Sequence, residues 1–309
     1  MRTTAFLLAI VLAALTAQAQ TSAPAGSPPQ SQTAGGQSSG AQAAPANGGH
    51  RMLQAKTQDE LKAYQDAASK TDPAQAEAAA SDFATKFPAS ELRAALYMRV
   101  MNMYAQANNS DKVIDNGRLA IAADPTNPVP LMEVASTLAE TTRDTDLDRE
   151  QRLAEAAKDA HAAIDNVDTG LLVPANADPA RVAGAKRTIL TNSYDTLAMV
   201  DMSRNDYQSA VTNLQKAIDQ SKENPEAVLY LRLSVAQDKL QQYPQALDSA
   251  NKAVQYSKEG GTAQSLAKQQ QERLQKLIAA QPGAAKPAGA PAPGAQANPA
   301  ATPGATTPH

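Results

Sequence analysis

Acidic residues at alternating positions form the stretch that most resembles a metal-binding loop. Asp144, Asp146 and Asp148 alternate along the chain, and Glu155 follows where an EF-hand loop places its bidentate ligand. Calcium in such a loop is held by oxygen ligands, and a glycine at the sixth position permits the sharp turn. Arg149 occupies that position. We therefore expect these acids to favour the N-terminus of a following helix, with calcium binding as the weaker alternative.

Side chains that could catalyse a reaction are few. The chain has three histidines, His50, His161 and His309, and it contains neither cysteine nor tryptophan. His161 lies in the helical stretch Ala-His-Ala-Ala-Ile, without the paired acid and nucleophile that catalysis would require nearby. We therefore expect His161 to lie between helices. The prediction is a protein that is not an enzyme and uses no cofactor or metal.

The first residues are typical of an export signal. Arg2 precedes an apolar run over residues 5–15, and Ala-Gln-Ala at 17–19 matches a small-x-small cleavage pattern. The run is shorter than the roughly 20 apolar residues of a membrane-spanning helix. We predict a signal peptide at 1–19 and no transmembrane segment after cleavage, with retention as an anchor as the alternative. The predicted destination is the periplasm, and secretion beyond the cell stays open.

Low-complexity sequence flanks a central region of mixed composition. Residues 20–50 are almost entirely Gly, Ser, Gln, Ala and other small or uncharged types, and residues 282–309 are rich in Pro and Ala. Such segments bury too little apolar surface to offset their chain entropy, so both are predicted to be disordered. Residues 51–281 are predicted to fold. The net charge of −3 gives no basic face for nucleic acid.

The folded region contains an internal repeat. Tyr194, Leu197 and Tyr207 recur as Tyr230, Leu233 and Tyr243, each 36 residues later. A fixed period of this size indicates a solenoid, in which each unit is covered only by its neighbours. Apolar residues within each period have helical spacing, and a polar break over 203–206 separates two helices. Each period is therefore predicted to be a helix hairpin.

The hairpins resemble tetratricopeptide repeats, whose unit of about 34 residues has an aromatic, Leu-Gly, Tyr and spaced alanines. The matching residues of the two best units are Tyr194, Leu197, Ala198, Tyr207, Ala210, Leu214 and Ala217, then Tyr230, Leu233, Ser234, Tyr243, Ala246, Ala250 and Ala253. Lys222 and Lys258 replace the closing proline of the family. An earlier unit, with Tyr97 and Tyr104, does end in the family's Asp-Pro linker.

This resemblance implies an all-α solenoid of helix hairpins. The predicted units lie near 57–90, 94–127, 128–167, 191–224 and 227–260, and the third of these is degenerate. A final helix at 262–281 is predicted to cover the exposed apolar end, as terminal units of solenoids must.

In the family, the first helices of the hairpins line a concave groove that binds a partner. The resemblance places Met98, Asn102, Asp195, Met199, Met202, Leu231, Val235 and Asp238 in that groove. Some members grip a terminal carboxylate with a Lys and Asn clamp. Here Met98 occupies the position of the clamp Lys, and only Asn102 matches the clamp. Binding of a terminal carboxylate by such a clamp is therefore not expected.

The predicted function is non-catalytic binding of a protein or peptide of the cell envelope. The alternative is a structural spacer or assembly factor anchored through its low-complexity ends. The oligomeric state stays open, as does a role of the degenerate third unit in binding or self-association.

Overall fold

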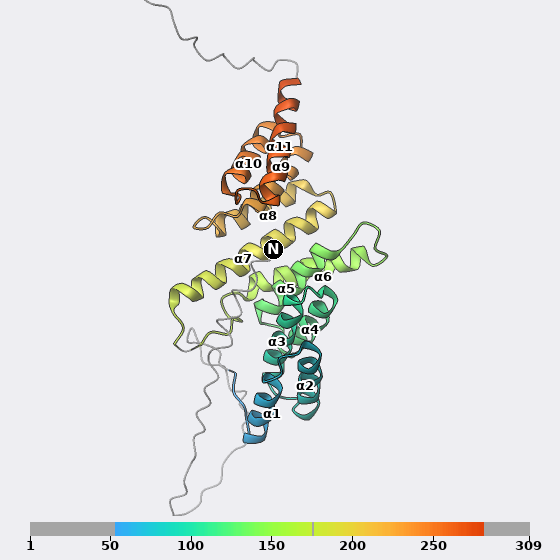
Figure 1. Cartoon of the computed structure of the whole chain (residues 1–309), viewed down its shortest axis with the longest axis vertical. Helices are drawn as coiled ribbons and strands as arrows, with labels where there is room; N and C mark the ends of the chain where they lie inside the picture. The colour runs from blue at the N-terminus through green and yellow to red at the C-terminus, as the bar shows by residue number, and fades with distance from the viewer. Residues whose placement is uncertain (1–52, 175, 281–309) are drawn as a thin grey trace, which may run out of the picture.

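The computed structural model describes residues 53–174 and 176–280 (Figure 1). The predicted signal peptide at 1–19, the linker at 20–50 and the tail at 282–309 lie outside the described residues. Within the described ranges all regular structure is helical. The helices are α1 (Gln58–Ala68), α2 (Pro73–Lys86), α3 (Leu92–Gln106), α4 (Ser110–Ala123), α5 (Pro128–Thr141), α6 (Arg149–Asn166), α7 (Pro179–Ser203), α8 (Tyr207–Gln220), α9 (Ala227–Lys239), α10 (Tyr243–Tyr256) and α11 (Thr262–Ala280).

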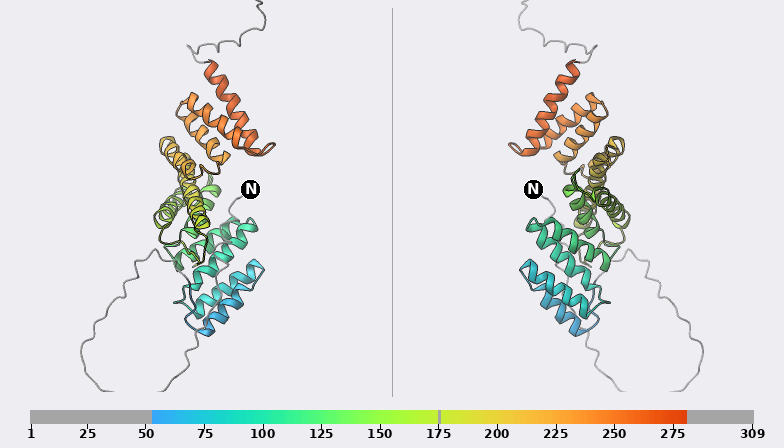
Figure 2. Two further views of the ribbon diagram at one scale, coloured as in Figure 1. Left: turned by 90° about the vertical axis from the view of Figure 1, so that its left-hand side faces the viewer. Right: turned by 90° about the vertical axis from the view of Figure 1, so that its right-hand side faces the viewer.

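Helices that are adjacent in sequence are adjacent in space. Five successive hairpins run from α1–α2 to α9–α10, and α11 packs against both α9 and α10. The hairpins stack along a curved path in the side views (Figure 2). This arrangement confirms the predicted fold class, an α-solenoid of helix hairpins with a final covering helix. None of the described helices combines the length and apolar composition needed to cross a membrane.

Small residues allow the paired helices to approach closely. The alanines that recur in the two best units are fully buried, and they are Ala210, Ala217, Ala246, Ala250 and Ala253. Leu274 of α11 packs against Ala246 and Ala250, so the last helix covers the end of the core. A side chain larger than alanine would force these helices apart, because protein interiors are close-packed.

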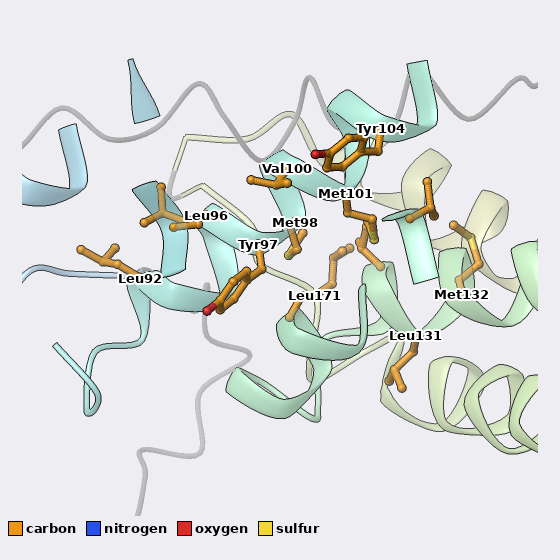
Figure 3. Packing of buried hydrophobic residues seen from close by; sticks show 14 of the residues in the cluster. Leu92, Leu96, Tyr97, Met98, Val100, Met101, Tyr104, Leu131, Met132 and Leu171 are labelled. Atoms are coloured by element: carbon orange, nitrogen blue, oxygen red, sulfur yellow. The ribbon is translucent and has the colours of Figure 1, made fainter. Parts of the chain in front are cut away.

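The N-terminal half has a core of larger side chains. Its residues come from α1 to α7 and from the connection between α6 and α7, and Figure 3 labels those of α3, α5 and this connection. Gly117 on α4 makes close packing possible here, because an added Cβ would lie 2.2 Å from Cγ2 of Val134 on α5. The unit predicted to be degenerate contains a complete hairpin, formed by α5 and α6. Its helix α5 is buried over most of its length.

Three hairpins share one turn geometry. Asn108, Asn205 and Gln241 adopt the left-handed conformation, with φ of 56°, 62° and 60°. The following amide donates to a carbonyl five residues back in each turn, as in a Schellman motif. Asparagine tolerates this conformation better than other non-glycine residues, whereas glutamine has no such local compensation. The α9–α10 turn therefore contains local backbone strain.

Replacing Gln241 with glycine should relieve that strain. We expect Gln241→Gly to raise the free energy of unfolding by about 0.5–1 kcal/mol, the left-handed penalty less the extra chain entropy of glycine. Urea unfolding followed by circular dichroism measures the change. Gln245→Gly, at an exposed position within α10, is the matched control and should lower stability by about 1 kcal/mol. An equal loss of unfolding free energy in both variants would show that the left-handed conformation of Gln241 is not strained.

A buried carboxyl on α6 makes stability depend on pH. Burial raises the pKa of Asp159 to about 6, and the negative charge of Glu155 adds to the effect. A carboxyl whose pKa is higher in the folded than in the unfolded chain binds more protons when folded. The fold therefore loses stability as the pH rises from about 4, the ordinary carboxyl pKa, to about 6.

Removing the charge should remove this dependence. One unit of pKa difference between folded and unfolded chains corresponds to about 1.4 kcal/mol. We expect Asp159→Asn to raise the free energy of unfolding at pH 7 by about 1–3 kcal/mol, with a smaller difference at pH 4.5. Urea titrations at both pH values provide the measurement. A constant difference between variant and wild type across this range would be inconsistent with a titrating Asp159.

Candidate functional site

Six of the eight predicted groove residues belong to two first helices, α7 and α9. We call these six the α7–α9 surface, and they are Asp195, Met199, Met202, Leu231, Val235 and Asp238. On each helix the three residues follow a spacing of four and then three, which places them on one helical face. All six are partly exposed.

The first acid of this surface is already paired. Arg232 of α9 donates from its Nη1 to the Asp195 carboxylate of α7, which joins two successive first helices. Burial raises the pKa of Asp195, Arg232 opposes this rise, and the charge of Glu140 reinforces it. The second oxygen of Asp195, Oδ1, is buried and has no hydrogen-bond partner among the described residues.

The second acid makes the equivalent connection one helix further along. Arg273 of α11 donates to the Asp238 carboxylate of α9, and only 9% of the Asp238 side chain is exposed. The Gln270 side-chain amide donates to the same Asp238 oxygen at 3.3 Å. Asp195 therefore ties α7 to α9, Asp238 ties α9 to the covering helix α11, and both charges are paired within the chain.

The four apolar members of the surface are half-buried. Met199 packs against a cluster that includes Leu138 of α5, and Met202 packs against one that includes Leu229 of α9. Leu231 and Val235 lie on the same face of α9 and remain partly exposed. The surface therefore combines half-exposed aliphatic and thioether groups with two internally paired acids.

The remaining two groove residues, on α3, are separate from this surface. Met98 is buried, and its sulfur accepts a hydrogen bond from the Asn127 side chain at 3.3 Å. Asn102 is half-buried, and its amide Nδ2 is buried with no hydrogen-bond partner among the described residues. Met98 is thus not available to a partner in this structure.

The acidic stretch is not gathered around one point. Asp144 pairs with Arg149 at 3.3 Å, and Asp146 accepts the backbone N–H of Arg143 at 2.8 Å. Asp148 occupies the N-cap position of α6, although its side chain makes no capping hydrogen bond. Over residues 53–174 and 176–280 there is no cluster of three or more potential metal ligands.

Two further predicted side chains have partners or positions that the sequence did not indicate. Glu155 accepts two hydrogen bonds of 2.7 Å from Arg118 of α4, and so connects two second helices. His161 is exposed on α6, so the prediction that it lies between helices was wrong. Its neighbours Ala160 and Ala163 take the buried positions of that helix.

Sequence reasoning missed the partners of the two groove acids. Arg232 and Arg273 lie 37 and 35 residues after Asp195 and Asp238, close to one repeat period. In both pairs an acidic residue is followed, about one repeat period later, by an arginine on the next helix but one. This spacing of opposite charges was the sequence signal that could have identified the two ion pairs.

A surface depression lies between α8, α9 and α10. It has a volume of about 530 Å³, and Tyr230, Leu233, Pro244 and Lys252 are among the residues that line it. The Tyr230 ring packs against Tyr256 with ring centroids 5.3 Å apart. None of the predicted groove residues lines this depression.

Comparison with known proteins gives weak likenesses only. No family model and no curated protein matches this chain. Among solved structures, the chain is similar to an assembly chaperone of RpL4, Acl4, with 11% identity over 71% of this chain and 96% of that chain, and a TM-score of 0.34. It is also similar to a tetratricopeptide repeat protein from Parabacteroides merdae, with 13% identity over 69% of this chain and 97% of that chain, and a TM-score of 0.27.

These scores are too low to support the fold, which the packing of successive hairpins establishes directly. The alanines of the two C-terminal hairpins are buried at the positions that the repeat pattern predicts, and Tyr194 packs against the core that contains Ala210 and Ala217. The chain therefore folds as an α-solenoid of helix hairpins.

Proposed function

We propose that the protein is a non-catalytic scaffold of the cell envelope, which binds a protein or peptide segment on the α7–α9 surface. One observation carries this proposal. Met199, Met202, Leu231 and Val235 remain partly exposed on helices that Asp195–Arg232 and Asp238–Arg273 hold together. A surface that is already held in place before binding loses little conformational entropy when a partner binds.

The chemistry of the surface favours an aliphatic partner segment. Paired acids leave little net charge to attract a cation, so the half-exposed apolar groups would supply most of the contact. Methionine side chains are flexible and polarisable, and they adapt to partners of different shape. A partner that covers these groups would gain about 25 cal/mol for each square ångström of apolar surface removed from water.

The envelope location rests on the predicted signal peptide at 1–19. Its charge, apolar run and small-x-small pattern are those of exported chains. We propose the periplasm as the destination, where a scaffold could hold an envelope protein during assembly.

Charge introduced on the surface should abolish partner binding. We expect the double variant Met199→Glu, Leu231→Glu to lose most partners that the wild-type protein captures by crosslinking in the native cell envelope. Burying an unpaired carboxylate against an apolar segment is strongly unfavourable. Mass spectrometry of the crosslinked products identifies the partners.

Leu119→Glu is the matched control, because Leu119 is a 42% exposed leucine on α4, away from the surface. It should capture the same partners as wild type, and all three proteins should keep the same helix content. Equal capture by the double variant and wild type would overturn the surface assignment. If capture then depended on residues 282–309, the structural spacer would be favoured.

A further inference from the structure

The connection between α6 and α7 is unlike the others in the solenoid. It runs over residues 167–178 and is longer than any other connection between described helices. Short links suffice between stacked hairpins, and longer loops in compact domains commonly have a function of their own. Within it, Leu171, Leu172 and Val173 are consecutive aliphatic residues with 8%, 5% and 9% exposure. A non-helical segment is thus buried as deeply as a core helix.

This segment packs in a core that includes α3 and α5, each the first helix of its hairpin. Leu171 and Val173 share a cluster with residues of α3 and α5. Figure 3 labels Leu171 among the side chains of this cluster, together with Met98 of α3 and Leu131 of α5. We call Tyr97, Met98, Asn102 and Leu131 the α3–α5 surface. Met98 was predicted to face a bound partner, but it is buried in the cluster that also contains the chain's own Leu171.

The segment is held mainly by its side chains. Leu171, Leu172 and Val173 make no backbone–backbone hydrogen bond with other described residues, whereas the Gly170 amide donates to the Asn166 carbonyl at 2.8 Å. Gly170 also fixes where the segment begins, because an added Cβ would lie 1.7 Å from the Thr126 carbonyl oxygen. Beyond Gly170, residues 171–173 have no regular secondary structure and are buried.

Two buried polar groups on α3 have no hydrogen-bond partner among the described residues. The Asn102 side-chain Nδ2 and the Arg99 Nε are buried, and neither has an acceptor among the described residues. Asn102 lies one helical turn beyond Met98, on the same face of α3. A buried donor without an acceptor is unfavourable, so an occupant whose main-chain carbonyl reached Asn102 would gain a hydrogen bond that Leu171–Val173 does not make.

We propose that the α3–α5 surface is a second binding site, for an extended peptide with consecutive aliphatic side chains. Residues 171–173 are its internal occupant, and an external peptide of the same chemistry displaces them. This site is separate from the α7–α9 surface, so it goes beyond the proposed function. An external peptide cannot bind while residues 171–173 cover the site. Its apparent affinity is therefore the intrinsic affinity multiplied by the fraction of molecules in which the site is uncovered.

A peptide added in trans tests the displacement. The probe is a fluorescent peptide with the sequence of residues 168–177, and the protein is the full chain after the predicted signal peptide. Leu171→Asp should weaken the internal contact, since a carboxylate is disfavoured among apolar groups. We expect the probe to bind this variant at least about tenfold more tightly than wild type, as fluorescence anisotropy would measure.

Two controls make the result specific. A probe with serine at both leucine positions should not bind Leu171→Asp, because it lacks the aliphatic side chains. Leu171→Asp combined with Leu231→Glu should bind the original probe as tightly as Leu171→Asp alone. Equal binding to wild type and Leu171→Asp, no binding to a folded Leu171→Asp, or loss on adding Leu231→Glu would each overturn the proposal.

Hydrogen exchange on the wild-type protein provides a test that needs no variant. If added probe displaces residues 171–173, their amides should exchange faster at saturating probe than without it, while the amide of Leu138, a fully buried residue of α5, should exchange at an unchanged rate. Exchange of residues 171–173 that saturating probe leaves unchanged would contradict displacement.

Discussion

Each helix hairpin has two apolar faces and can bury neither alone, and the rest of the structure depends on this constraint. Stacking covers these faces, and the fully buried alanines, such as Ala210 and Ala246, set how closely the helices approach. Because the stack is regular, first helices lie in sequence along it, and residues one period apart come into contact. A continuous surface follows from the same packing that provides stability.

The acids of the first helices show how that surface is maintained. Asp195 contacts Arg232 and Asp238 contacts Arg273, so two successive junctions have an ion pair of the same kind. Removing one member of a partly buried pair leaves its partner charge uncompensated, which costs more than the pair itself contributes. These pairs therefore fix the positions of α7, α9 and α11, and the exposed apolar side chains between them keep a defined arrangement.

The sequence predicted the solenoid well because its period is visible in residues that pack, such as Tyr194 and Tyr230. It predicted less about the surface, for two physical reasons. Charged groove residues were expected to face a partner, but a charge one period away is also a neighbour, as Arg232 is to Asp195. Leu171 to Val173 have no helical period, so nothing in the pattern indicated that a connecting segment belongs to the same core as Met98. Met199, Met202, Leu231 and Val235 stay predictions as binding residues.

The central claim is that partners bind the α7–α9 surface while the rest of the same hairpin stays free. A photo-crosslinking amino acid in place of Val235 tests it most directly, compared with the same substitution at Tyr256, which is 39% exposed on α10 of that hairpin. Illumination in the native cell envelope should couple a specific partner at position 235 and not at 256. The same partner coupled at both positions, or only at 256, would contradict the account.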